Sequence, residues 1–94
     1  MSDSERIRAH VFVSGRVQGV FYRASTREKA RQQGVDGWVK NLDDGRVEAV
    51  FEGPPSAVES MVEWCKTGSQ AASVEAVDRT TEQPVGTTGF EIRR

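Results

Sequence analysis

The 94-residue sequence has little of what metal sites and disulfides require, because it contains one cysteine and one histidine. A single cysteine cannot form an internal disulfide, which fits a reducing compartment, so we expect the chain in the cytoplasm. A lone cysteine and a lone histidine also argue against a zinc site. We therefore expect no metal ion and no cofactor.

The sequence also lacks an excess of charge of one sign and any long apolar run. Its formal net charge is −1, whereas nucleic-acid-binding domains usually carry a basic excess. No apolar run approaches the length of a membrane span, and the polar N-terminus has no signal-peptide core. We expect no nucleic-acid or membrane partner, and a monomer with one domain over 1–94, in which 1–5 is a flexible N-terminus.

Local patterns predict five strands and two helices. Apolar and polar residues alternate at the start of the chain, which is typical of a strand, and Asp-Gly at 44–45 favours a tight hairpin turn. Apolar residues at i, i+3, i+4 and i+7 predict an amphipathic helix after Pro55. The predicted elements are strands over 7–14, 35–42, 46–52, 74–77 and 90–92, helices over 22–33 and from Pro55 to Gly68, and a loop over 80–88.

This order of elements is the split βαβ pattern of ferredoxin-like domains. The fold class that we expect is α+β, of the form β-α-β-β-α-β with a short additional C-terminal strand. Both helices are expected on one face of an antiparallel sheet. The pairing of the C-terminal strand is left open by the sequence.

The stretch Ser14-Gly-Arg-Val-Gln-Gly-Val-Phe-Tyr-Arg23 joins the first predicted strand to the first predicted helix. Gly15 and Gly19 can adopt positive φ at little cost, so successive main-chain N–H groups can converge on one anion at the helix N-terminus. Arg23 adds a planar fork that suits two phosphate oxygens. The same pattern also fits an ordinary strand-to-helix turn with a solvated arginine, and it is not a Walker A loop because no Lys-Ser/Thr follows.

Elsewhere, the familiar catalytic sets are missing from the sequence. His10 lies on a predicted strand, and Cys65 on the apolar stripe of the second helix, so we interpret both as structural. Asp43 and Asp44 are interpreted as turn residues rather than a metal pair. Asn41 precedes the hairpin turn, where asparagine is also common for conformational reasons.

The remaining groups fit one kind of reaction. Phosphoryl transfer has a loose transition state, which positioning and electrostatics can stabilise. The leaving group of an acyl phosphate is a carboxylate with a pKa of about 4, so no general acid is required. An anion-binding loop with one arginine and one asparagine is therefore better suited to an acyl phosphate than to a phosphate monoester.

Three blocks of the sequence resemble the acylphosphatase family. Gly15–Arg23 resembles its signature loop, Gly37-Trp-Val-Lys-Asn-Leu-Asp-Asp-Gly-Arg-Val-Glu48 resembles its second signature, and Gly89-Phe-Glu-Ile-Arg93 resembles its last strand. The blocks occur in the family's order, and the resemblance extends from about Arg8 to Arg93. It implies a metal-independent hydrolase that converts a small-molecule acyl phosphate into a carboxylate and inorganic phosphate, with phosphate as product and competitor.

The resemblance also implies a role for each residue of the site. Main-chain N–H groups of the loop would hold the phosphoryl oxygens, Arg23 would bind the same group from the side, and Asn41 would orient the attacking water. The expected phosphate-binding loop consists of Gly15, Arg16, Val17, Gln18, Gly19, Val20 and Phe21. The alternative is a non-catalytic module of the same fold that binds a phosphorylated metabolite or a partner.

Overall fold

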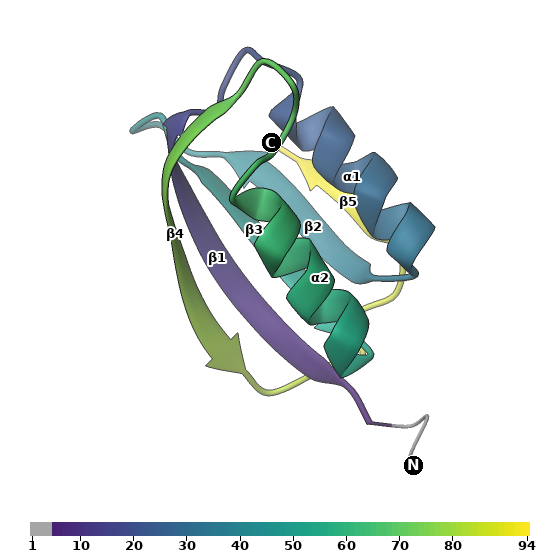
Figure 1. Cartoon of the computed structure of the whole chain (residues 1–94). Coiled ribbons are helices and arrows are strands. Elements are labelled where there is room, and N and C mark those ends of the chain that lie inside the picture. Colours follow the sequence, from purple (N-terminus) through teal and green to yellow (C-terminus); the bar gives the residue numbers. More distant parts are fainter. Residues whose placement is uncertain (1–4) are drawn as a thin grey trace.

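The computed structural model describes residues 5–94, so residues 1–4 of the predicted N-terminal segment lie outside the described part. Two helices cover one face of a five-stranded sheet (Figure 1), which confirms the expected ferredoxin-like α+β architecture. The elements are β1 (Ile7–Arg16), α1 (Tyr22–Gln33), β2 (Asp36–Asn41), β3 (Val47–Gly53), α2 (Pro55–Cys65), β4 (Ser73–Glu82) and β5 (Phe90–Arg93). Neither described helix has the length and apolar character needed to cross a membrane.

The strand order in the sheet is β4-β1-β3-β2-β5. Strand β1 pairs antiparallel with β3 and β4, and β2 pairs antiparallel with β3. Strand β5, whose pairing the sequence left open, pairs parallel with β2, so the antiparallel sheet that we expected is mixed at this edge. The chain leaves β4 at one edge, crosses the end of the sheet and enters the opposite edge at the end where β2 begins (Figure 1).

Strand β4 is longer than its sequence suggests. It covers ten residues, Ser73–Glu82, where four were predicted, and the predicted loop over 80–88 is correspondingly shorter. It pairs along β1 from Arg16↔Ser73 to Arg8↔Glu82, on an outer edge of the sheet where most of its side chains are exposed. Pairing with β1, rather than an apolar periodicity of its own, therefore determines its length. Strand β1 likewise continues past 14, through an irregularity at Ser14/Gly15.

The apolar core lies between the helices and the sheet. Alternate residues of β1 are buried there together with residues of the loop, both helices and the central strands. The fully buried side chains of largest volume include Tyr22, Phe51 and Met61. Burial of this face fixes the position of α1, and with it the position of the loop that precedes α1.

The opposite face of the sheet carries a network of charged groups around the buried Glu52. Its carboxylate accepts hydrogen bonds from Arg8 Nη1 at 2.9 Å and from the N–H groups of Gly86 at 2.8 Å and Thr87 at 3.2 Å. Burial raises the pKa of Glu52, but these bonds and one from the Val85 N–H outweigh burial, so its pKa is lowered. The ionised carboxylate thus holds the segment that leads into β5.

Candidate active site

The loop between β1 and α1 uses the positive φ angles that its glycines permit. Gly15 has φ 118° and Gly19 has φ 74°, while Phe21, the residue before α1, adopts the left-handed conformation at φ 62°. A Cβ on Gly15 would collide with the main-chain oxygen of Ser73 and lie 2.7 Å from the nitrogen of Glu75. Gly15 is therefore required for the close approach of β4 to β1.

The side chain of Gln18 fastens this loop to the hairpin between β2 and β3. Its Nε2 donates to the carbonyl oxygens of Leu42 at 2.7 Å and Arg46 at 2.9 Å. The hairpin begins directly after Asn41, so these two bonds tie the loop to the strand end that carries Asn41. The main chain of the loop is consequently held in place before any ligand binds.

Buried groups hold the other side of the loop. Val17 and Val20 are buried in the core, and Ser69 Oγ donates to the Val20 carbonyl at 2.7 Å. Tyr22, the first residue of α1, is also buried, and its hydroxyl donates to the Cys65 carbonyl at 2.8 Å. These contacts anchor Val17, Val20 and Tyr22 in the core and so fix the course of the main chain between them.

The N-terminus of α1 adds further free donors. Its first main-chain hydrogen bond runs from the Ser25 N–H to the Phe21 carbonyl at 3.0 Å. The N–H groups of residues 22–24 therefore have no carbonyl partner within the helix. No side chain caps this end, and its first turn holds no acidic residue. The helix dipole therefore adds a positive potential that nothing in the first turn offsets.

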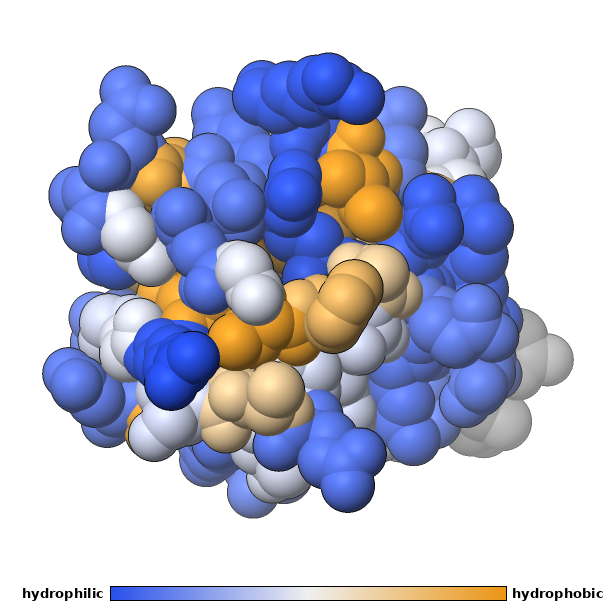
Figure 2. All heavy atoms as spheres, turned by 90° about the horizontal axis from the view of Figure 1, so that it is seen from above, coloured by the Kyte–Doolittle hydropathy of each residue, from blue (hydrophilic) through white to orange (hydrophobic). Residues whose placement is uncertain are grey.

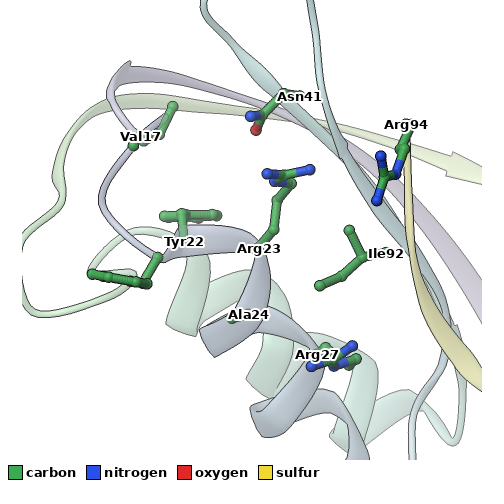
Figure 3. A pocket seen from close by; sticks show the side chains of 10 residues that line it. Val17, Tyr22, Arg23, Ala24, Arg27, Asn41, Ile92 and Arg94 are labelled. Atoms are coloured by element: carbon green, nitrogen blue, oxygen red, sulfur yellow. The ribbon is translucent and has the colours of Figure 1, made fainter.

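Arg23 and Asn41 come from different elements and point into the same pocket of about 750 Å³ (Figure 3). The guanidinium of Arg23 forms no ion pair with any carboxylate of residues 5–94. Asn41 Oδ1 is buried and accepts no hydrogen bond from the described residues. The residues lining the pocket are Val17, Gly19, Phe21, Tyr22, Arg23, Ala24, Arg27, Asn41, Ile92 and Arg94, none of them acidic.

The sequence signature and the whole-chain comparison agree with this geometry. The family model for acylphosphatase matches residues 9–92. The chain belongs to the acylphosphatase family. An acylphosphatase of Natronomonas pharaonis is 70% identical over 97% of this chain and 99% of that protein, and one of Gloeobacter violaceus is 59% identical over 94% and 95%. As a member of this family, the chain is a hydrolase of small acyl phosphates.

Solved structures agree with the fold of this acylphosphatase family member. The crystal structure of acylphosphatase from Bacillus subtilis superimposes with a TM-score of 0.90 at 39% identity, over 94% of this chain and 99% of that chain. Viewed onto the end of the molecule that carries the loop, a small apolar area is surrounded by hydrophilic side chains (Figure 2). This end of the molecule is thus polar at its rim and apolar toward its centre.

Several of the predicted site residues line this pocket, and several others do not. Arg23 and Asn41 line it together with three loop residues, Val17, Gly19 and Phe21. The remaining predicted loop residues are not part of the lining: Gly15, Arg16, Gln18 and Val20. The side chain of Arg16 is exposed and does not line the pocket.

The sequence interpretation missed lining residues on α1 and β5. Arg27 follows Arg23 by four residues and so lies on the same face of α1, a spacing that could have revealed it. Ile92 and Arg94 reach the pocket through the parallel pairing of β5 with β2, which no local pattern indicates.

The two residues interpreted as structural lie away from the acylphosphatase pocket. His10 lies on the other face of the sheet, where its ring nitrogens contact Glu82 at 2.7 Å and Glu48 at 2.6 Å. Cys65 is buried in the core, and burial raises the pKa of its thiol to about 12. This thiol is protonated at neutral pH, so it is not an activated nucleophile.

Proposed function

We propose that the pocket hydrolyses acyl phosphates without a metal ion, with each role carried by a named group. Main-chain N–H groups from Arg16 to Phe21 hold the phosphoryl oxygens, Arg23 binds the same group from the side, and Asn41 orients the attacking water. The observation that carries this proposal is that Asn41 Oδ1, buried and without a hydrogen-bond partner among residues 5–94, shares a pocket with the Arg23 guanidinium, which pairs with no carboxylate of the same residues.

The reaction requires little acid–base chemistry from the protein. The water oxygen attacks phosphorus, the bond from phosphorus to the acyl oxygen breaks, and the carboxylate leaves with the electron pair. Because a carboxylate is a weak base, no general acid needs to protonate it. The amide of Asn41 offers an acceptor and two donors, so it orients the water without removing its proton. That proton passes to a phosphoryl oxygen of the substrate or to bulk water.

Binding of the phosphoryl group rests on charge-assisted hydrogen bonds. Each hydrogen bond to a charged group contributes about 1.5–3 kcal/mol, so three or four fixed N–H groups and a bidentate arginine can hold a dianion. Inorganic phosphate presents the same oxygens, and it is expected to compete with the substrate. A purely binding module of this fold is not favoured, since the chain belongs to a family of hydrolases.

The experiment that tests the assignment compares turnover with phosphate affinity. Hydrolysis of benzoyl phosphate is followed by absorbance in the presence of EDTA, and phosphate binding is measured by calorimetry. We expect Asn41→Ala to lose about 100-fold or more in kcat while its phosphate Kd changes only a few-fold. Gln83→Ala, which removes an exposed amide side chain outside the pocket, is the matched control.

Two results would contradict these roles. A collapse of phosphate affinity in Asn41→Ala would make Asn41 a phosphate ligand rather than a group that orients water. Loss of wild-type turnover in EDTA would require a metal ion. Each result alters a different part of the proposal, because the first concerns Asn41 alone and the second concerns the whole reaction.

We also propose that the chain acts as one domain and as a monomer in the cytoplasm, without a nucleic-acid or membrane partner. The nearly balanced charge and the single, buried cysteine support this assignment. Light scattering of the purified protein tests the oligomeric state, and a dimer would contradict it.

A further inference from the structure

The arginines of this chain fall into three groups: those with a partner, those that line the pocket, and Arg16, which is exposed outside the pocket and forms no ion pair with a carboxylate of residues 5–94. Some have partners: five form ion pairs with carboxylates, and Arg31 donates to the Phe90 carbonyl at 3.2 Å. The five paired arginines are Arg6, Arg8, Arg46, Arg79 and Arg93. Arg23, Arg27 and Arg94 line one pocket, and none of these three forms an ion pair with a carboxylate of residues 5–94. The pocket therefore gathers cations for which the protein supplies no counter-charge.

The three guanidinium groups surround one opening from two elements (Figure 3). Arg27 follows Arg23 by one turn of α1, which corresponds to about 6 Å along the helix axis. Arg94 follows the end of β5, and Ile92 lies between Arg94 and Arg27 in this view. The phosphoryl group bound by the loop and Arg23 therefore has two further cations beyond it, on the side away from the loop.

Placing these cations together opposes folding. Like charges four residues apart on one helix face repel each other, and neither Arg23 nor Arg27 has a carboxylate to offset this. The side chain of Arg27 is also half-buried, which limits its solvation. A phosphoryl group at Arg23 and the loop supplies a counter-charge to Arg23, and a second anion bound between Arg27 and Arg94 would supply one to the other two guanidinium groups.

We propose that Arg27, with Arg94, forms a subsite for a second anionic group on the acyl part of the substrate. The enzyme then prefers acyl phosphates whose acyl group carries a carboxylate or a phosphate over uncharged acyl phosphates of similar size. Ile92 contacts the apolar body between the two charged ends. Arg94 is exposed, so Arg27 is the main specificity-determining residue. The inference rests on the hydrolytic function proposed above.

The test compares substrates that differ in one remote group. Benzoyl phosphate, 4-carboxybenzoyl phosphate and 4-phosphonobenzoyl phosphate are hydrolysed by the wild-type enzyme, and each kcat/KM is divided by that of benzoyl phosphate. We expect a preference of about two- to fivefold for the charged substrates, as one partly exposed ion pair provides. The carboxylate and phosphonate substrates distinguish the two possible sources of the second charge. High salt is expected to weaken the preference, because salt screens exposed charges.

Two variants localise the effect. Arg27→Gln is expected to bring the ratio close to one, while Lys29→Gln, which removes the same charge from α1 outside this pocket, is expected to keep the wild-type ratio. Dividing the wild-type ratio by the variant ratio cancels differences in the intrinsic reactivity of the substrates. Thermal unfolding of each variant verifies that it is folded.

The outcomes separate this inference from the hydrolytic function. Hydrolysis of all three substrates with equal kcat/KM would overturn the subsite and leave the function intact. An unchanged ratio in Arg27→Gln, or an equal loss in Lys29→Gln, would overturn the assignment to Arg27. Failure to hydrolyse any of the three substrates would refute the proposed function, and the subsite with it.

Discussion

The two hydrogen bonds of the Gln18 side chain allow the contribution of loop anchoring to be measured. Gln18→Ala removes the bonds to the carbonyls of Leu42 and Arg46. Both carbonyls keep another donor, because Leu42 O accepts from the Gly45 N–H at 3.2 Å and Arg46 O accepts from the Leu42 N–H at 2.8 Å. The change therefore leaves no carbonyl without a donor, and the loss is that of two neutral hydrogen bonds.

Two such bonds contribute about 2 kcal/mol in total. For a domain of this size, that loss lowers the Tm by about 8–16 °C. The freed loop also has to be ordered again when phosphate binds, so kcat/KM for benzoyl phosphate is expected to fall by about tenfold. Gln18→Glu is expected to be worse than Gln18→Ala, because a carboxylate cannot donate to two carbonyls and its charge opposes the phosphate.

Urea unfolding and benzoyl phosphate kinetics measure both effects, with Gln83→Ala as the exposed-amide control. The reasoning is refuted if Gln18→Ala unfolds at the same urea concentration as the control and keeps kcat/KM within about twofold. A loss of stability with full activity would mean that the loop keeps its shape without the anchor, which would contradict the role assigned to preorganisation.

Three further variants test other parts of the structure. Arg23→Lys is expected to lower kcat/KM by about 100-fold, because a lysine cannot form a bidentate contact. Its Tm should change little, because Arg23 forms no ion pair with a carboxylate of residues 5–94. Near-normal turnover would exclude a bidentate role. Burial lowers the pKa of His10, but its hydrogen bonds to two glutamates raise this pKa by more. The protonated ring therefore stabilises the fold fully below about pH 6.5, and this contribution to stability is lost as the pH rises through the raised pKa. Tm measured from pH 6 to 9 should therefore decline more in the wild type than in His10→Gln, and parallel curves would contradict this. Gly68 has φ 70°, and Gly68→Ala would place a Cβ against the ring of Tyr22. This variant should lower the Tm more than Gly86→Ala, because Gly86 has a similar φ of 82° but no atom lies within 4 Å of its added Cβ. Equal losses of Tm would show that the Tyr22 ring moves aside freely.

Most of the helices and inner strands could be predicted from the sequence because their signals are local. The helix over 22–33 and its end at Gly34 agree with the structure, and so does the hairpin that Asp-Gly indicates. The positive φ angles of Gly15 and Gly19 follow from the same short-range reasoning. Each of these features depends on residues within a few positions of one another.

The edges of the sheet could not be predicted in the same way. The length of β4 comes from its pairing with β1, and the direction of β5 comes from a crossing held by Glu52, far away in sequence. Strand β4 carries no strong period-two pattern, since an edge strand with few buried side chains does not need one. The residues of β5 do alternate between apolar and polar, but alternation does not indicate which strand β5 pairs with or in which direction. Such pairing depends on which strands remain available after the centre of the sheet has formed.

The same distinction between local and long-range signals applies to the candidate active site. The sequence by itself determined that a glycine-containing loop precedes a helix, that Arg23 lies in the first turn of this helix and that Asn41 ends a strand. Only the tertiary structure decided that Arg23 and Asn41 share one pocket, that Gln18 fastens the loop to the hairpin, and that Arg94 stands opposite Arg27. The reason is physical: conformation is set mainly by neighbouring residues, whereas the arrangement of charges around a pocket depends on how distant segments pack.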